Sequence, residues 1–482
     1  MSKLLRDKNL RCLIVAVLFV LCGSFSNAAD ADVAEDADVV AFEGLSGFSR
    51  LHEESAMEQA DSLKVSDLLK SGKTKKVFPD GSSLILTIDK GLQSEIFNLF
   101  LRYDPPYGAF VAMEPSTGRV VALVGYRKGG KSDPWLALRA IYPAASLVKV
   151  ITASAAIELG KISPSDEVWY QGGLYSINRA GIHSDFGSAS MTFEEAFARS
   201  ANGVFGRVTV RDVGTSALMT YLDKFGFGSP IPFDMPVEPS RAEVPSDEYE
   251  LARTGAGFGE VYASPLHMAM VMAALASDGR MPRPILIDRI VGADGNVEYE
   301  SAPAIFQDAV YPETAQALVR MMVKTIEMGT SRRAFGTPDK TPLLQGMEVA
   351  GKTGSLSGWT PRLHFGWFAG FAPVDSPRLA LAALVANDVQ WKIRGSYVGK
   401  EAFSFYFGYP PSDPPPPHYV KSKGKSVRKI NKAGKKKNTK TVKAKPVKKK
   451  PKRQNRARVS IAERHACASA GYNMEAAWTS NV

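Results

Sequence analysis

The sequence predicts a mixed α/β domain, of the layered α+β type, between Gly81 and about Tyr409. Strand-like and helix-like segments alternate along this range. Three strand-like segments follow one another near its end, and helix-like segments stand at either end of the strand groups. Strands grouped in this way with helices around them are typical of a sheet covered by helical layers.

The first half of the domain supplies a strand, two helices and a hairpin. Residues 84–88 are apolar or β-branched, as in a buried strand. Apolar residues over 92–103 recur every three or four positions, which predicts an amphipathic helix. Segments 109–113 and 120–124 flank a Pro-Ser-Thr-Gly turn and predict a hairpin. A helical run over 147–159 then stops at a glycine.

The second half supplies the grouped strands. Residues 347–355, 363–371 and 379–385 are apolar runs with turn residues between them, so they predict three successive strands. Residues 400–407 follow as a closing helix. No internal repeat interrupts this order.

The composition is that of an ordinary globular protein. The chain has 482 residues, of which 45% are hydrophobic and 23% charged, so whole-chain disorder and fibrous repeats are excluded. The only continuous apolar run lies at the N-terminus, which excludes a polytopic membrane protein. Two of the three cysteines, Cys12 and Cys22, fall in that run, and Cys467 alone cannot support a disulfide framework.

The N-terminus predicts export. Residues 1–28 carry basic residues, an apolar stretch over 12–25 and a small-residue cleavage site, the pattern of a signal peptide. An uncleaved anchor is the alternative, although a spanning helix needs roughly 20 residues. Leu21 disfavours a lipoprotein at Cys22. We expect the protein in the periplasm or cell envelope, with membrane association left open, and residues 29–80 as a short acidic lead-in.

The C-terminus is expected to be a disordered tail. A proline-rich linker over 410–420 precedes a basic tail over 421–482. Residues 421–458 contain 19 Lys or Arg and no Asp or Glu. The net charge of the whole chain is +11, so the rest of the chain has a net charge of 11 − 19 = −8. The tail is expected to bind an anionic envelope surface or to stay solvated without a fixed partner. Nucleic acid is not expected as a partner of an exported chain.

Several kinds of active site are absent from the sequence. It has no H-E-x-x-H, no paired cysteines, no G-x-S-x-G elbow and no phosphate-binding P-loop, so neither a metal nor another cofactor is expected. His183, His267 and His364 lack partners at ligand spacing and are expected to be structural. Serine chemistry with a lysine in place of histidine remains.

Ser146 and Lys149 form an S-x-x-K motif at the start of the helix over 147–159. Positions i and i+3 share a helix face, so the hydroxyl and the amine can meet. A desolvated lysine can take the serine proton. Lowering its pKa to near 7 costs about 4–5 kcal/mol, which burial and a second cation would supply. A helix-capping serine followed by a solvated lysine is the alternative, and Ser422 begins an accidental S-x-x-K in the tail.

Two further motifs strengthen this interpretation. Ser200 and Asn202 form S-x-N after a helix-like segment, and Lys352-Thr353-Gly354 lies on the first of the late strands. Taken singly, the first pair is compatible with a turn and the second motif with a strand bulge. The three motifs in this order, each on a suitable element, indicate one site.

The motif set S-x-x-K, S-x-N and K-T-G resembles that of the transpeptidase domain of penicillin-binding proteins. The resemblance implies a mainly antiparallel sheet flanked by helices, with an all-helical lobe, of the β-lactamase/transpeptidase-like type. It spans about Leu84 to Phe407 and includes further segments: Leu86-Thr87-Ile88-Asp89, Val111-Ala112-Met113-Glu114-Pro115, Gly257-Phe258-Gly259, Ser264-Pro265-Leu266 and the run HFGWFAGFAP from His364 to Pro373.

The resemblance implies an active-site serine acyl-transferase acting on peptidoglycan stem peptides that end in D-Ala-D-Ala. Ser146 would attack the penultimate carbonyl and expel D-alanine, with Lys149 as general base and Ser200 passing a proton to the leaving amine. β-Lactams would be covalent inhibitors. The same family implies cell-wall cross-linking as the physiological role.

The other motif residues are implied to bind substrate. Asn202 would orient the donor peptide or the base. Lys352 would keep the general base neutral and, with Thr353, meet the terminal carboxylate, while Gly354 belongs to the same strand. The N–H of Ser355 and that of the nucleophile would form the oxyanion hole.

Three alternatives stay open at this point. A D,D-carboxypeptidase would use the same chemistry with water as the acceptor. A non-catalytic penicillin-binding scaffold would act through its basic tail. A β-lactamase needs a carboxylate that activates the deacylating water, and no convincing candidate lies between Lys149 and Lys352.

Overall fold

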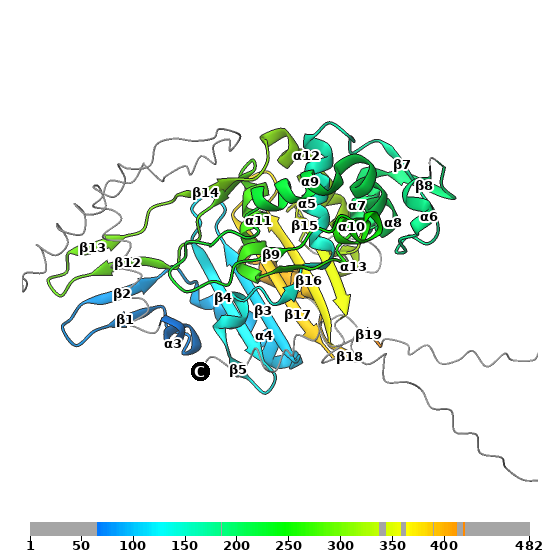
Figure 1. The fold of residues 1–482 in the computed structure, drawn as a ribbon. Coiled ribbons are helices and arrows are strands. Elements are labelled where there is room, and N and C mark those ends of the chain that lie inside the picture. Colours follow the sequence, from blue (N-terminus) through cyan, green and yellow to red (C-terminus); the bar gives the residue numbers. More distant parts are fainter. Residues whose placement is uncertain are drawn as a thin grey trace, which may run out of the picture. The chain divides into compact units, whose positions relative to one another are not determined.

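The computed structural model describes residues 65–184, 186–336, 344–357, 363–388, 390–411 and 418–419. A six-stranded sheet in the order β15-β16-β17-β3-β4-β5 forms the centre of this part of the chain (Figure 1). All its neighbouring strands are antiparallel. The strands are β15 (Ala350–Ser357), β16 (His364–Ala372), β17 (Leu379–Asn387), β3 (Tyr107–Met113), β4 (Val120–Arg127) and β5 (Lys131–Ser132).

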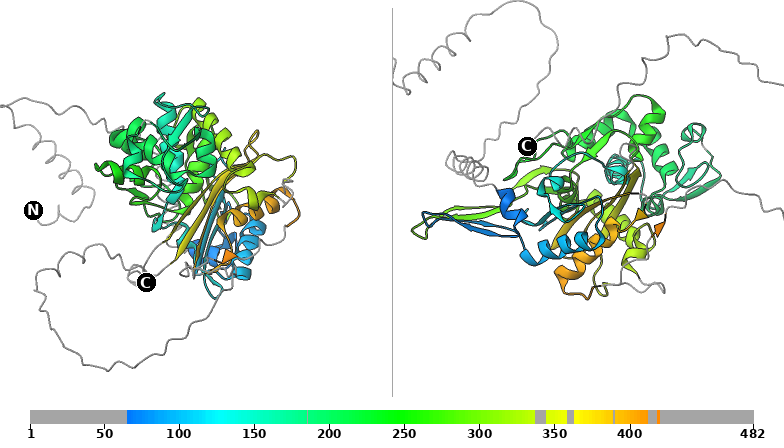
Figure 2. Two further views of the ribbon diagram at one scale, coloured as in Figure 1. Left: turned by 90° about the vertical axis from the view of Figure 1, so that its right-hand side faces the viewer. Right: turned by 90° about the horizontal axis from the view of Figure 1, so that it is seen from below.

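Each face of this sheet is covered by helices. Alternate residues of a strand point to opposite faces, so Ala382 and Leu384 of β17 join one core cluster while Leu381 and Ala383 join the other. Helix α11 (Pro265–Ala276) covers the first face. Helices α4 (Lys90–Tyr103) and α14 (Gly395–Phe407) cover the second, as Figure 2 shows with the sheet between the two layers.

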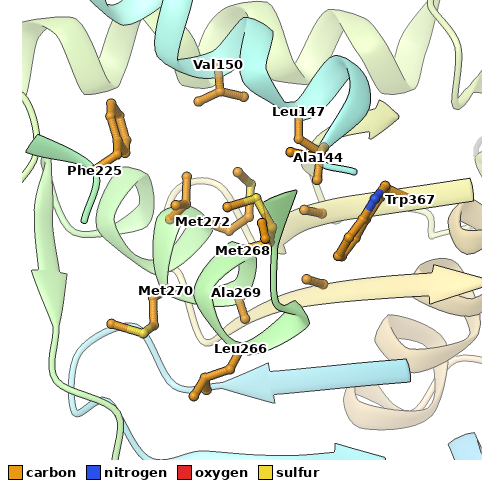
Figure 3. Close-up of a cluster of buried hydrophobic side chains, with 14 of the residues drawn as sticks. Ala144, Leu147, Val150, Phe225, Leu266, Met268, Ala269, Met270, Met272 and Trp367 are labelled. Atoms are coloured by element: carbon orange, nitrogen blue, oxygen red, sulfur yellow. The ribbon is translucent and has the colours of Figure 1, made fainter. Parts of the chain in front are cut away.

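Helix α11 is buried on all sides. Every residue from Pro265 to Leu275 is buried, because the helix lies between the sheet and α5 (Val148–Glu158). Figure 3 shows Met268 and Met272 of α11 with Leu147 and Val150 on one side and Trp367 of β16 nearby. This apolar packing fixes α5 relative to the sheet.

A helical lobe lies above the first face. Its helices are α5, α7 (Phe193–Arg199), α8 (Asn202–Val208), α9 (Gly214–Lys224) and α10 (Glu248–Gly255). Helix α12 (Pro312–Glu327) contacts both α7 and the edge strand β15, so it joins the lobe to the sheet. The predicted fold class, a mainly antiparallel sheet with flanking helices and a helical lobe, is confirmed.

A second, four-stranded sheet extends from the first (Figure 1). It consists of β1 (Lys75–Val77), β2 (Ser83–Leu86), β12 (Ile287–Val291) and β13 (Val297–Glu300). Strand β1 pairs with β2. Helix α3 (Val65–Lys70) buries three apolar residues in the core cluster on the first face of the central sheet. The domain start expected at Gly81 therefore falls inside this sheet, between two paired strands.

Short elements complete the described chain. They are β6 (Tyr142–Pro143), β7 (Glu167–Tyr170), α6 (Arg179–Ile182), β8 (Ala189–Thr192), β9 (Arg241–Ala242), β10 (Val261–Ala263), β11 (Arg280–Pro282), β14 (Ile305–Asp308), α13 (Arg332–Phe335), β18 (Gln390–Trp391), β19 (His418–Tyr419), the 3₁₀ turns Pro134–Ala137 and Ala145–Leu147, and the π-turn Thr209–Val213.

Several expectations fall elsewhere in the chain. The signal peptide over 1–28, most of the lead-in over 29–80 and the basic tail over 421–482 lie outside the described residues. Within the described ranges, no helix combines the length and the apolar character that crossing a bilayer requires.

Candidate active site

The turn that carries Ser146 is held by two neighbouring glycines. Ala145 has a φ of 50°, a left-handed conformation that costs an L-residue free energy. A Cβ on Gly257 would lie 2.2 Å from the Ala145 carbonyl oxygen and 2.8 Å from the Ser146 nitrogen. One on Gly354 would lie 3.3 Å from that nitrogen. The loop after α10 and strand β15 therefore both pack closely against the turn.

Lys149 lies one helical turn after Ser146 and is fully buried. Its Nζ is 2.9 Å from Ser146 Oγ, 2.9 Å from Asn202 Oδ1 and 2.5 Å from the Ala256 carbonyl oxygen. A neutral amine satisfies this geometry, because it can donate to the amide and carbonyl oxygens and accept the proton of the serine hydroxyl.

The electrostatics favour that neutral form. Burial lowers the pKa of Lys149 well below its usual range, and the positive charge of Lys352 lowers it further. Its hydrogen-bond partners are uncharged oxygens, so no carboxylate restores the charged form. The amine can therefore accept a proton.

Lys352, in the middle of β15, is the second buried amine of the site. Its Nζ is 3.1 Å from Ser200 Oγ and 3.0 Å from the Thr353 carbonyl oxygen. Burial lowers the pKa of Lys352 to about 7. A group with this pKa is partly protonated near neutral pH and can transfer or hold a proton.

The corner between α7 and α8 places the S-x-N residues. Ser200 ends α7 with a φ of 57°, and Asn202 begins α8. This left-handed corner directs Ser200 to Lys352 and Asn202 to Lys149. Asn202 Nδ2 also donates to the Tyr175 carbonyl oxygen at 2.9 Å, which fixes the orientation of its amide.

The three motifs meet at one cleft with a volume of about 670 Å³. Ser146, Ser200, Asn202, Thr353 and Ser355 line it. The two lysines lie directly behind this lining, hydrogen-bonded to the two serines, and Gly354 packs on the nucleophile turn. All eight residues singled out in the sequence are thus brought together.

The cleft also contains residues that the motifs did not indicate. Thr330 Oγ1 lies 2.5 Å from Thr353 Oγ1, beside the K-T-G strand. His364, expected to be purely structural, lines the cleft, with its Nδ1 2.6 Å from Ser357 Oγ. Arg333 and Arg394 line it as well. Thr330, Arg333 and Arg394 come from loops and element ends, and no sequence pattern predicted them. His364 begins the run that resembles the family, but that run did not indicate a place in the cleft.

The class of protein follows from this arrangement. A mainly antiparallel sheet, a helical lobe, a serine–lysine turn between them and a K-T-G edge strand define the β-lactamase/transpeptidase-like fold. A family model described as the penicillin binding protein transpeptidase domain matches residues 108–404. The chain belongs to this family, as the motifs had led us to expect.

Curated relatives carry names that agree with the family. Peptidoglycan D,D-transpeptidase PbpA of Mycobacterium tuberculosis is 28% identical over 348 residues, which cover 64% of this chain and 68% of that protein. Peptidoglycan D,D-transpeptidase MrdA of Haemophilus influenzae is 25% identical over a match that spans 68% of this chain and 56% of that protein. The chain is therefore an enzyme of the serine-type D,D-transpeptidase class.

Solved structures agree with the fold. The imipenem acyl-enzyme complex of penicillin-binding protein A from M. tuberculosis superimposes with a TM-score of 0.57 at 25% identity, over 68% of this chain and 80% of that one. The D,D-transpeptidase domain of the peptidoglycan glycosyltransferase from Eggerthella lenta gives a TM-score of 0.57 at 23% identity, over 68% and 83% of the two chains.

Proposed function

We propose that this protein is an exported D,D-transpeptidase that cross-links peptidoglycan peptides through an acyl-enzyme on Ser146. The observation that carries the proposal is the 2.9 Å contact between Lys149 Nζ and Ser146 Oγ, in a buried site without a carboxylate among its described partners. Such an amine is a competent general base for the hydroxyl.

Acylation is the first step. Ser146 Oγ attacks the carbonyl carbon of the penultimate D-alanine while its proton passes to Lys149 Nζ. Backbone N–H groups of Ser146 and Ser355 stabilise the oxyanion, and removing one such donor costs about 10²–10³ in rate. The close approach of β15 to the nucleophile turn supports this assignment.

Expulsion of D-alanine is the second step. The C–N bond breaks and Ser200 delivers a proton to the leaving amine, with Lys352 restoring that proton through the 3.1 Å contact. Lys352 and Thr353 hold the terminal carboxylate, supported by the position of Thr353 in the cleft. Asn202 orients the donor peptide and the base.

Deacylation completes the reaction. The amino group of a second stem peptide attacks the ester carbonyl and gives up its proton through Ser200 to Lys352, which regains the proton lost in the second step. Lys149 returns its proton to Ser146 Oγ as the ester C–O bond breaks, so Ser146 is released and a new peptide bond is formed. Because the reaction uses extracellular wall peptides, we place the enzyme in the periplasm or envelope, delivered by the signal peptide over 1–28. The tail over 421–458 is proposed to bind an anionic envelope surface.

Labelling with a fluorescent penicillin tests the proposal. We expect stoichiometric acylation of the full chain, complete loss in Ser146→Ala, and no change in Ser154→Ala. Ser154 lies on α5, the helix that follows the Ser146 turn, and donates to the Val150 carbonyl oxygen in the core. Wild-type protein that takes up no label would overturn the proposal and favour the non-catalytic scaffold.

A second assay separates the two catalytic outcomes. A D-Ala-D-Ala pentapeptide incubated with an amino acceptor gives cross-linked product from a transpeptidase and trimmed peptide from a carboxypeptidase. A β-lactamase is disfavoured, because no carboxylate lines the cleft among the described residues. Rapid turnover of a chromogenic cephalosporin would contradict that ranking.

A further inference from the structure

A second wall of the cleft carries two arginines that the proposed chemistry does not use. Arg333 lies on α13, and Arg394 is the residue on which α14 begins. Both line the same cleft as Ser146. The two helices that carry them, α13 and α14, are in contact. Burial lowers the pKa of Arg394, and the positive charge of Arg333 lowers it further.

Nothing in the described part of the chain neutralises this pair. Neither guanidinium forms an ion pair with a described carboxylate, and no described Asp or Glu lines the cleft. Arg394 Nε and Trp391 Nε1 are buried and lack hydrogen-bond acceptors among these residues. Two adjacent cations with an unsatisfied donor are unfavourable unless an anion joins them.

The beginning of α14 adds to the positive potential. This helix has 13 residues, and no side chain caps its first N–H groups. Gly395 and Ser396, its first two residues, line the cleft. Unsatisfied N–H groups and the helix dipole favour a negative charge at this end. Trp391, whose ring lies 4.8 Å from the Arg394 guanidinium carbon, supports that side chain from one side.

We propose that Arg333, Arg394 and the start of α14 bind a second carboxylate of the peptide donor, in addition to its C-terminal carboxylate. The inference rests on the proposed function, since the C-terminal carboxylate is assigned to the K-T-G end. The planar fork of a guanidinium donates two parallel hydrogen bonds to the oxygens of a carboxylate. The carboxylate comes from a residue that precedes the D-Ala-D-Ala end.

Matched peptides test the proposal and locate the carboxylate. The substrates are pentapeptides ending in D-Ala-D-Ala with a free carboxylate on the third residue or on the second, each paired with its primary amide. For wild type we expect one carboxylate peptide to exceed its amide about 10- to 100-fold in kcat/KM, the range of a charge-assisted pair. The position that shows the preference identifies the source.

Variants assign the effect to the two arginines. In Arg394→Gln and in Arg333→Gln the carboxylate-to-amide ratio should fall toward 1. Arg332→Gln should keep the wild-type ratio, because Arg332 is the neighbouring arginine of the same helix but does not line this cleft. Arg394→Lys, which keeps the charge without the bidentate fork, should give an intermediate ratio.

The outcomes separate this inference from the proposed function. Penicillin labelling of each variant reports a folded active site. If wild type is labelled but shows no carboxylate preference, or if both glutamine variants keep the full preference, the anion site is rejected and the acyl-transfer mechanism stands. If wild type is not labelled at all, the proposed function itself fails.

Discussion

The buried lysines of the described chain occupy two different kinds of surroundings. Lys149 and Lys352, at the cleft, contact hydroxyl, amide and carbonyl oxygens. Lys400, inside the layer formed by α14, contacts the carboxylate of Glu401. Burial lowers the pKa of Lys400, but Glu401 opposes the shift, whereas at the cleft a second cation adds to the shift of Lys149.

The difference distinguishes a structural amine from a reactive one. A buried amine next to a carboxylate keeps its proton and contributes to packing. A buried amine surrounded by neutral oxygens is held ready to accept a proton, at a cost in stability. The same residue type therefore stabilises one region and does chemistry in the other, and substitutions should affect the two regions in opposite ways.

Replacing the two kinds of lysine by methionine gives the largest contrast. Lys149→Met should slow penicillin acylation by about 10²–10⁴-fold, the range for a general base, while the free energy of unfolding stays equal or rises. Lys400→Met should leave acylation unchanged and lower the free energy of unfolding by about 1–3 kcal/mol, because the cation beside Glu401 is lost. Acylation kinetics and urea unfolding measure both effects.

The opposite pattern would remove the distinction. Comparable acylation losses in the two variants, or strong destabilisation by Lys149→Met with little loss of rate, would mean that the cleft amine is structural.

A pair of glycines tests how closely the cleft region is held. Gly257→Ala places a methyl 2.2 Å from the Ala145 carbonyl oxygen at a φ of 93°. Gly129→Ala meets nothing within 4 Å at a similar φ of 86°. We expect Gly257→Ala to reduce acylation about 10²-fold, since small displacements of a reacting group have effects of this size.

Gly129→Ala is the matched control. This variant should lower the free energy of unfolding by only about 1 kcal/mol, because alanine is strained at a positive φ, and its acylation rate should equal that of wild type. Equal rates in the two variants would show that the nucleophile turn tolerates displacement.

The pH dependence of stability should show the smallest effect. The pKa of Lys352 is about 7 in the folded protein and near 10.5 when unfolded, so between these pH values the unfolded chain holds a proton that the folded chain has lost. Stability therefore rises with pH in this window, by up to about 1.4 kcal/mol per pH unit. Unfolding midpoints at pH 7 and pH 9 measure the rise.

Substitution identifies the group responsible. Between pH 7 and pH 9 the free energy of unfolding should rise by roughly 2 kcal/mol less in Lys352→Met than in wild type. Lys131→Met, which removes an exposed lysine of β5, should keep the wild-type gain. An unchanged gain in Lys352→Met would contradict the depressed pKa.

Local patterns predicted five of the six strands of the central sheet, the helices α4, α5 and α14, and all three motifs. The hairpin β3–β4, the strands β15 to β17 and helices α4 and α5 lie where the periodicity put them, because each depends on nearby residues. The pairing of β17 with β3 joins segments far apart in the chain, and no local pattern encodes it. The placement of Arg333 and Arg394 on one cleft wall depends on the same long-range packing.

The position of α12 has a consequence for the width of the cleft. This helix touches α7, whose last turn leads to Ser200, and β15, which carries Lys352. An ion pair between Glu194 and Lys324 fastens it to α7. Helix α12 also contacts α5, which carries Lys149, so a displacement of α12 would act on all three motif-bearing elements and thereby on the width of the cleft.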